Sequence, residues 1–377
     1  MKTRIEAKTL AAAAHWVSRA LPARPPVPVL GGLLLAADTH GTVDGLIVSG
    51  FDYETSARVE LDATVGEPGR VLVSGRLLAD ITKSLPDKPV DLTADGARMT
   101  LVCGSSRFSL PLMPVDEYPA LPPMPDRTGT VPGDVWAAAV GQVTMAAGRD
   151  DSLPMLTGVR LEVDGERITM AATDRFRLAV REFGWSPDTP DVSAAMLLPA
   201  RTLAEMAKSL STAGTVDISL GDSGMVGFTA AGRRATTRLL DAEFPRFRQL
   251  IPTQHDTAAE VEVSELAAAL KRVALVAGRA AQAILNIDGE GIRLTAGGDD
   301  LGSAEESIPA LVEGAELRIA FNPAYVLDAL TSLPTARARF EFTNPNRPAT
   351  CRPAGEAGAN TGLTYLLMPV RIPGAAA

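Results

Sequence analysis

The feature that most constrains the fold of this chain is a helical pattern that recurs three times at nearly constant intervals. An apolar residue is followed by further apolar residues three, four and seven positions later, which places all four on one face of an α-helix. The three copies are Leu10/Ala13/Ala14/Val17, Trp136/Ala139/Val140/Val143 and Leu266/Ala269/Leu270/Val273. Their first positions are 126 and 130 residues apart.

A second helical pattern recurs with nearly the same period. Its three copies are Leu78/Ile81/Leu85, Leu203/Met206/Leu210 and Val326/Ala329/Leu333, at steps of 125 and 123 residues. A repeat of this length corresponds to a whole domain rather than to a solenoid unit. The chain of 377 residues is therefore expected to contain three similar domains, at residues 1–126, 127–252 and 253–377.

The residues between the helices follow the pattern of half-buried strands. Val159, Leu161 and Val163 alternate with polar residues, and Asp164–Gly165 is a typical hairpin turn. Residues 216–220 and 338–342 repeat the alternation. One apolar and one polar face indicate antiparallel sheets that are covered on one side. The predicted fold class is α+β, with two helices packed on antiparallel sheets in each domain.

Asparagine and proline residues mark the ends of the second helices and of the domains. Asn322 is a favourable N-cap and Pro323 suits the first helical turn, whereas Pro86 and Pro334 end their helices. The boundaries are rich in proline, at residues 118–125 and in Phe244–Pro245 followed by Leu250–Ile251–Pro252. We expect short, stiff and extended connectors there.

Composition limits the classes of function. The net charge of −9 argues against a protein that holds nucleic acid by bulk electrostatic attraction. No run of about 18 apolar residues predicts a membrane span. The N-terminal residues lack the apolar core of a signal peptide, so we expect a cytoplasmic location. Cys103 and Cys351 are too few for a disulfide framework or a cysteine-based zinc site.

The chain offers little evidence of catalytic chemistry. Its three histidines, His15, His40 and His255, share no ligand-like or triad-like spacing. There is no phosphate-binding loop of the GxxxxGK type. Asp299–Asp300 beside two glycines fits a solvated turn better than a calcium loop, because the other ligands are missing. We therefore expect a non-catalytic protein with no cofactor and no metal site.

Two segments combine apolar and basic residues in a way that suits binding. In residues 172–179, Thr173–Asp174 opens a turn that presents aromatic, basic and apolar groups in quick succession, although an ordinary turn would have the same composition. Residues 365–372 form a dense apolar cluster, which predicts either a last sheet strand or a binding lip.

Together these features resemble the bacterial DNA polymerase III beta subunit, the family of sliding clamps. The similarity is spread over the whole chain. The segments that carry it are 24–31 with 33–35, Ser106–Leu110, Ala172–Ala179, Glu243–Pro245, Phe321–Asn322 with Tyr325–Asp328, and Met368–Arg371.

The resemblance implies a head-to-tail homodimer whose six domains form a closed ring around duplex DNA, with helices lining the hole and sheets outside. Such a protein is a processivity factor, and a ring held by topology can be acidic overall. The implied partners are duplex DNA without sequence preference, a second copy of the chain, the replicative polymerase, the clamp loader and repair polymerases. No membrane partner is implied.

The resemblance also implies sites. A pocket for short peptide motifs is expected at Leu156, Thr173, Arg175, Phe176, Arg177, Leu178, Pro245, Leu250, Leu366, Leu367, Met368, Pro369, Val370 and Arg371. The DNA contacts carried over are Arg24 and Arg149. Cations on the expected helices add candidates that face either the hole or solvent, namely Arg76, Lys83, Arg201, Lys208, Lys271 and Arg272. Ring closure is expected to join Phe108 and Leu110 of one subunit to Leu275 and Val276 of the other.

The chain departs from the family at three places. Arg175 stands where a small residue is usual and could crowd the pocket, residues 278–283 lack bulky side chains, and the chain continues past Ile372 as Pro373–Ala377. Two alternatives are therefore retained. One is a divergent paralogous clamp with a role in repair or in a mobile element. The other is a monomeric peptide-binding scaffold that does not encircle DNA.

Overall fold

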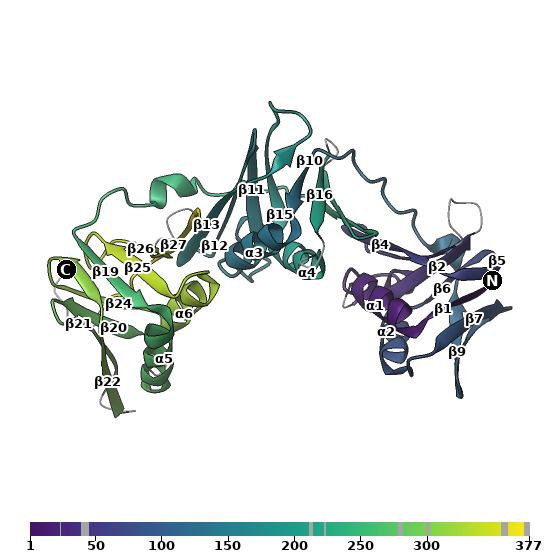
Figure 1. The fold of residues 1–377 in the computed structure, drawn as a ribbon, viewed down its shortest axis with the longest axis horizontal. Helices are drawn as coiled ribbons and strands as arrows, with labels where there is room; N and C mark the ends of the chain where they lie inside the picture. Colours follow the sequence, from purple (N-terminus) through teal and green to yellow (C-terminus); the bar gives the residue numbers. More distant parts are fainter. Residues whose placement is uncertain are drawn as a thin grey trace. The chain divides into compact units, whose positions relative to one another are not determined.

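The computed structural model describes residues 1–22, 24–38, 45–210, 214–221, 224–277, 282–298, 302–355 and 361–372 (Figure 1). The chain forms two compact units. The first comprises Met1–Trp136, Ser186–Thr189 and Glu205–Leu239, and the second comprises Ala137–Trp185, Pro190–Ala204 and Leu240–Ala377. His40, residues 278–281, Asp299–Asp300 and Pro373–Ala377 lie outside the described residues.

The two recurring apolar patterns correctly predicted six α-helices in the described part of the chain. They are α1 (Ala7–Ser18), α2 (Gly75–Ser84), α3 (Gly133–Thr144), α4 (Ala200–Leu210), α5 (Val263–Val273) and α6 (Pro323–Ser332). The predicted cap of α6 is confirmed, because the side-chain oxygen of Asn322 accepts a hydrogen bond from the N–H of Ala324 at 3.0 Å.

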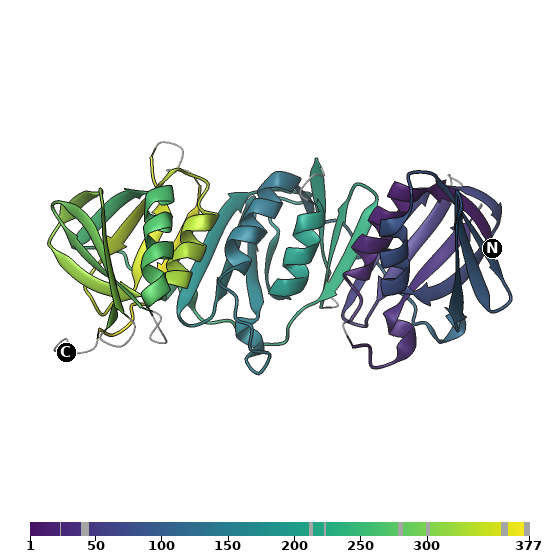
Figure 2. The same cartoon turned by 90° about the horizontal axis from the view of Figure 1, so that it is seen from below.

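The first unit contains one 14-stranded antiparallel sheet. In order across the sheet, its strands are β14 (Ser186–Pro187), β10 (Gly129–Pro132), β16 (Thr215–Leu220), β17 (Met225–Ala230), β18 (Arg233–Arg238), β4 (Thr55–Asp62), β3 (Gly45–Phe51), β2 (Gly32–Asp38), β6 (Gly69–Ser74), β9 (Ser106–Met113), β8 (Arg98–Cys103), β7 (Pro89–Asp95), β1 (Lys2–Glu6) and β5 (Thr64–Glu67). Helices α1 and α2 lie side by side and contact β2 (Figure 2).

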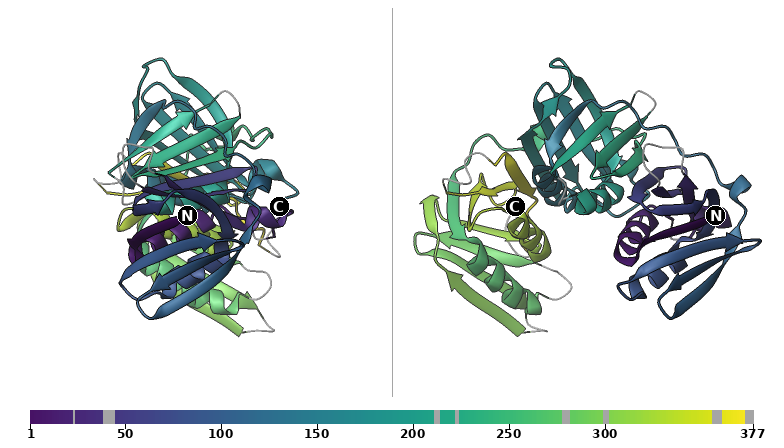
Figure 3. Two further views of the ribbon diagram at one scale, coloured as in Figure 1. Left: turned by 90° about the vertical axis from the view of Figure 1, so that its right-hand side faces the viewer. Right: turned by 45° about the vertical axis from the view of Figure 1, so that its right-hand side comes forward.

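The second unit contains a nine-stranded and a four-stranded antiparallel sheet. The first has the order β15 (Ser193–Pro199), β11 (Gly158–Asp164), β12 (Arg167–Thr173), β13 (Arg177–Gly184), β27 (Leu363–Leu367), β26 (Ala349–Pro353), β25 (Arg337–Phe342), β19 (Thr257–Glu262) and β23 (Leu311–Gly314). The second has the order β22 (Gly302–Ile308), β21 (Gly291–Gly298), β20 (Ala283–Asp288) and β24 (Leu317–Phe321). Helix α5 contacts α6 on one side and β21 and β22 beneath it (Figure 3).

The predicted α+β fold with antiparallel sheets is confirmed, and so is the hairpin at Asp164–Gly165, where β11 pairs with β12. Gly165 has a φ of +53°, a conformation that glycine adopts without strain. The domain boundaries expected at residues 126 and 252 stay predictions. The second connector is not simply extended, because Phe247–Leu250 forms the 3-10 helix η4.

Two glycines provide a test of local backbone constraint. Gly314 has a φ of +95°, and a Cβ there would lie 2.0 Å from the carbonyl oxygen of Asp256. Gly141 lies within α3, and a Cβ there would meet nothing within 4 Å. We expect Gly314→Ala to lower the free energy of unfolding by about 1–3 kcal/mol. Gly141→Ala should instead raise it by about 0.5–1 kcal/mol.

Thermal and urea unfolding followed by circular dichroism measure both changes. Each variant serves as the control for the other, since both add one methyl group. An unchanged or raised midpoint for Gly314→Ala would contradict the backbone geometry described at the end of β23.

Candidate functional site: an apolar groove at one end of the nine-stranded sheet

The candidate site is positioned by the order of five neighbouring strands, β12, β13, β27, β26 and β25. Arg177, at the start of β13, is paired with Leu367 at the end of β27, and Leu367 is paired in turn with Ala349 at the start of β26. The β12–β13 turn and the β25–β26 turn therefore lie at the same end of the sheet. They flank the point where β27 ends and the chain continues into Met368.

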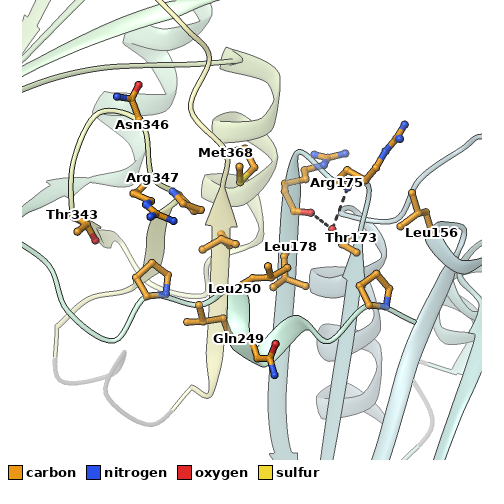
Figure 4. Close-up of a pocket in the computed structure, with 16 residues that line it drawn as sticks. Leu156, Thr173, Arg175, Leu178, Gln249, Leu250, Thr343, Asn346, Arg347 and Met368 are labelled. Carbon is orange, nitrogen blue, oxygen red and sulfur yellow. Dashed lines mark hydrogen bonds between the residues drawn. The ribbon is translucent and has the colours of Figure 1, made fainter. Parts of the chain in front are cut away.

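A groove of about 630 Å³ lies between these turns (Figure 4). Most of its wall is apolar, and the exposed side chains of Leu250 and Met368 form part of it. The lining residues are Leu156, Thr173, Arg175, Arg177, Leu178, Pro245, Gln249, Leu250, Ile251, Pro252, Thr343, Asn346, Arg347, Pro348, Leu366 and Met368. An open apolar groove with a few polar groups suits a ligand with apolar anchors.

A buried cluster supports the groove. It joins Ala171, Leu178, Val180, Leu197, Phe244, Phe247 and Leu366, with Ile251 packed against it. Phe244 and Phe247 contact each other edge to face at 6.0 Å between ring centroids. These two aromatic anchors hold the connector against the sheet. Pro245 and residues 249–252 consequently form one wall of the groove.

The β12–β13 turn is held by a network of short-range hydrogen bonds. Asp174 Oδ1 accepts bonds from the N–H groups of Phe176 and Arg177, both at 3.0 Å. Thr173 Oγ1 accepts from the N–H of Arg175 at 3.2 Å and donates to the carbonyl of Arg177 at 2.7 Å. Arg175 itself has a φ of +78°, the left-handed region that strains any residue with a Cβ. This geometry explains why a small residue would suit the position.

Arg177 is the electrostatic centre of the site. Its Nε donates to Asp174 Oδ2 at 3.0 Å, its Nη1 donates to Asp328 of α6, and its guanidinium lies 4.6 Å from the ring centroid of Tyr325. Burial disfavours the charged form of Arg177, but the two carboxylates outweigh that effect and raise the pKa of the guanidinium. The positive charge of Arg177 is thus held in place and balanced by the carboxylates of Asp174 and Asp328.

The structure gathers nine of the fourteen expected pocket residues around this groove. They are Leu156, Thr173, Arg175, Arg177, Leu178, Pro245, Leu250, Leu366 and Met368. Phe176 instead stacks on Tyr325, with 6.2 Å between ring centroids, and Leu367 is buried. Pro369, Val370 and Arg371 continue past the groove, where the N–H of Val370 donates to the carbonyl of Ala320 at 2.8 Å.

Seven lining residues were missed by the sequence analysis. They are Gln249, Ile251, Pro252, Thr343, Asn346, Arg347 and Pro348. Ile251 and Pro252 lie in the connector recognised from its prolines, so that composition was a usable signal. Residues 343–348 follow a predicted strand as an ordinary turn. Nothing in their composition indicates that this turn meets the one at residues 174–176.

The eight candidate DNA-contacting cations are all exposed. Arg24 follows α1, Arg149 follows α3, and the other six lie on helices α2, α4 and α5. Arg272 and Lys208 each contact a carboxylate. Arg272 Nε donates to Glu306 Oε2 of β22 at 2.9 Å, and Lys208 Nζ lies 3.7 Å from Glu205 Oε1. Because its guanidinium already binds Glu306, Arg272 is less available to a DNA phosphate than its exposed position on α5 would indicate.

The four residues expected at a subunit interface differ in their exposure. Leu275 is 85% exposed, while Val276 and Phe108 are half-buried. Leu110 is only 1% exposed, so its side chain belongs to the core of the first unit and cannot reach a partner. Phe108 on β9 is only partly covered within its own chain and can contact a partner.

The two described histidines and the two cysteines lie apart from the groove lining. His15 Nε2 lies 3.1 Å from Arg19 Nη2, and His255 Nδ1 lies 3.8 Å from Glu341 Oε1. Cys103 and Cys351 are free and buried, and burial raises the pKa of Cys351. Within the described ranges, no group of three or more His, Cys, Asp or Glu residues is arranged to hold a metal ion. No helix there has the length and apolar content needed to cross a membrane.

Three family models match successive parts of the chain. They describe the N-terminal domain of the DNA polymerase III beta subunit at residues 1–122, its central domain at residues 130–246 and its C-terminal domain at residues 248–371. Together the matches extend over nearly the whole sequence.

Similar proteins agree with these matches. The beta sliding clamp of Streptomyces coelicolor is 50% identical over 99% of this chain and 100% of its own length. The sliding clamp of Bacillus subtilis has a TM-score of 0.90 at 29% identity, covering 99% of both chains. A Pseudomonas aeruginosa sliding clamp bound to griselimycin has a TM-score of 0.90 at 25% identity, covering 99% of this chain and 100% of that one. The chain therefore belongs to the DNA polymerase III beta subunit family, the non-catalytic bacterial DNA sliding clamps.

Proposed function

We propose that two copies of this chain close into a ring around duplex DNA and tether the replicative polymerase and other proteins through the apolar groove. The observation that carries the proposal is the groove itself, which combines exposed Leu250 and Met368 with a rigid polar rim. Short peptides with leucine and phenylalanine anchors fit such a surface. Neither a divergent paralogue nor a monomeric scaffold is favoured, since a full-length relative at 50% identity is a beta sliding clamp.

Two strand edges support ring closure. Residues 106–111 of β9 pair with β8 on one side, and β6 pairs only with residues 112 and 113. Strand β22 has β21 on one side and no second strand among the described residues. Such open edges can form an intermolecular sheet.

The residues on these edges complement each other. Arg107 is exposed on β9, and Glu305 is exposed on β22, so opposite charges are available to the two edges. Phe108 on β9 and Leu275, in the 3-10 helix Ala274–Val276 that contacts β22, supply apolar groups that a partner would cover. Different surfaces on one chain give a heterologous contact, and two such contacts related by a twofold axis close a ring.

A ring also accounts for DNA binding by an acidic protein. The exposed cations on α2, α4 and α5 are too few to hold DNA against a net charge of −9. A closed ring retains DNA by topology and needs only weak, non-specific phosphate contacts. In this proposal the helices face the duplex, and the polymerase, clamp loader and repair polymerases bind the groove.

A cytoplasmic location remains a prediction.

Ring closure predicts a stable dimer that a charge at the interface disrupts. Light scattering over a dilution series should give twice the 39.4 kDa of one chain. In Leu275→Asp, burying an unpaired carboxylate should raise the dimer dissociation constant by about 100-fold or more. Leu77→Asp, at an exposed leucine on α2, is the matched control and should stay dimeric. A monomeric wild-type protein would contradict the ring.

Topological binding predicts that retention depends on the shape of the DNA. Protein loaded onto nicked circular DNA should remain bound through gel filtration, whereas it should slide off linear DNA. Blocking both ends of the linear DNA with a bulky protein should restore retention. Equal loss from circular and open linear DNA would rule out encirclement.

If peptides bind in the groove, truncating apolar side chains of its wall should lower peptide affinity, whereas truncating an apolar side chain elsewhere should not. Leu250→Ala and Met368→Ala should each weaken binding of a peptide with Leu and Phe anchors by about tenfold, because each removes part of the contact surface. Leu311→Ala, at another exposed leucine outside the groove, should leave affinity unchanged. Fluorescence anisotropy with labelled peptide measures all three. Equal affinities of the wild-type protein and the two groove variants would show that the peptide binds outside the groove.

A further inference from the structure

The charge of the groove contrasts with the charge of the chain. Its lining includes three arginines and no aspartate or glutamate, although the net charge of the protein is −9. Arg177 is compensated by Asp174 and Asp328. The exposed Arg175 and Arg347 belong to none of the ion pairs found in the described part of the chain. The apolar surface therefore has a positively charged rim.

The two rim arginines are held on different turns. Arg175 lies on the β12–β13 turn and Arg347 on the β25–β26 turn, and the end of β27 runs between them. Figure 4 shows Leu178 and Leu250 between the two arginines. A peptide lying along the apolar floor would accordingly meet one guanidinium on each side.

The backbone of each turn is fixed by local contacts. In the β25–β26 turn, the N–H of Asn346 donates to Asn344 Oδ1 at 2.9 Å, and the N–H of Arg347 donates to the carbonyl of Asn344 at 3.3 Å. Prolines at 345 and 348 restrict the same turn. Arg175 is held by the network around Thr173 and Asp174. Little backbone ordering is needed when a ligand arrives.

We propose that the groove selects peptides in which the Leu and Phe anchors are flanked on both sides by Asp or Glu, and that Arg347 and Arg175 determine this preference. The inference rests on the proposed peptide-binding function and specifies its ligand. Guanidinium groups bind carboxylates in bidentate geometry. Two separated guanidiniums require two carboxylates, which acidic side chains on both flanks supply and a single C-terminal carboxylate does not.

The two arginines contribute unequally. Asp150 lies near Arg175, and the pKa of its carboxyl is lowered first by hydrogen bonds from the side chain and N–H of Ser152 and then by the charge of Arg175. This nearby carboxylate offsets part of the attraction between Arg175 and an incoming acidic residue. The larger effect on peptide selection is therefore expected at Arg347.

The test compares four labelled peptides with the same Leu and Phe anchors on the full-length protein by fluorescence anisotropy. Three have an amidated C-terminus and carry serine on both flanks, aspartate on both flanks, or lysine on both flanks. The fourth has serine flanks and a free C-terminal carboxylate. The aspartate peptide should bind wild-type protein about tenfold more tightly than the amidated serine peptide, and the advantage should shrink at high ionic strength.

Charge-removing variants identify the residues. Arg347→Gln should reduce the advantage of the aspartate peptide about fivefold, and Arg175→Gln should reduce it less. Arg347→Lys should keep part of the affinity advantage of the aspartate peptide, because lysine retains the positive charge. Arg167→Gln is the matched control, because Arg167 is an exposed arginine at the opposite end of β12, roughly 20 Å along the strand, and outside the groove lining.

The outcomes separate this inference from the function on which it rests. Equal affinity of the serine and aspartate peptides would overturn the acidic preference while leaving peptide binding intact. The same gain from the free C-terminal carboxylate alone would overturn the assignment to flanking side chains. A preference that survives in the Arg347→Gln/Arg175→Gln double variant would overturn the residue assignment. Absence of binding by every peptide would instead refute the proposed groove function itself.

Discussion

The pairing of β13 with β27 is the constraint on which the candidate site depends. It joins residues that are far apart in sequence, in a register that runs from Arg177↔Leu367 to Arg181↔Leu363. A shift of one residue would turn Leu366 away from the groove and bring Leu367 toward it, because side chains alternate between faces. The register is held from the helical side as well. The buried hydroxyl of Tyr365 donates to the carbonyl of Gln142 on α3, whose side-chain amide donates to Ser332 on α6 at 3.1 Å.

The ion pairs of Arg177 add an electrostatic constraint to this strand register. Arg177 starts β13 and reaches Asp328 on α6, so a single guanidinium connects the β12–β13 turn to the helix beside β27. Removing a partner of a buried charge is costly, whereas the intact pair adds little net stability. The contribution of Arg177 is therefore best understood as orientation. It holds the turn that carries Thr173 and Arg175 in one arrangement at the groove.

The sequence predicted local structure well and long-range pairing only in part. The six helices follow from apolar spacing because a helix is defined by its own residues, and the cap at Asn322 is equally local. The wall formed by residues 343–348 could not be predicted, since it depends on β26 lying next to β27. Leu110 and Leu367 were assigned to surfaces but are buried, because alternation does not reveal which face of a strand is covered. Likewise, nothing near Arg272 in the sequence indicates Glu306 as its partner.

At position 175, the residue that would best stabilise the left-handed backbone is not the residue that places a positive charge at the groove. A non-glycine residue in this conformation costs about 1–2 kcal/mol, so glycine would relieve the turn while removing a guanidinium from the groove rim. Random variation screened only for heat resistance should therefore accumulate glycine at this position. Variation screened for partner capture should retain arginine. The residue found at position 175 in laboratory-evolved descendants would thus reveal which property had been selected.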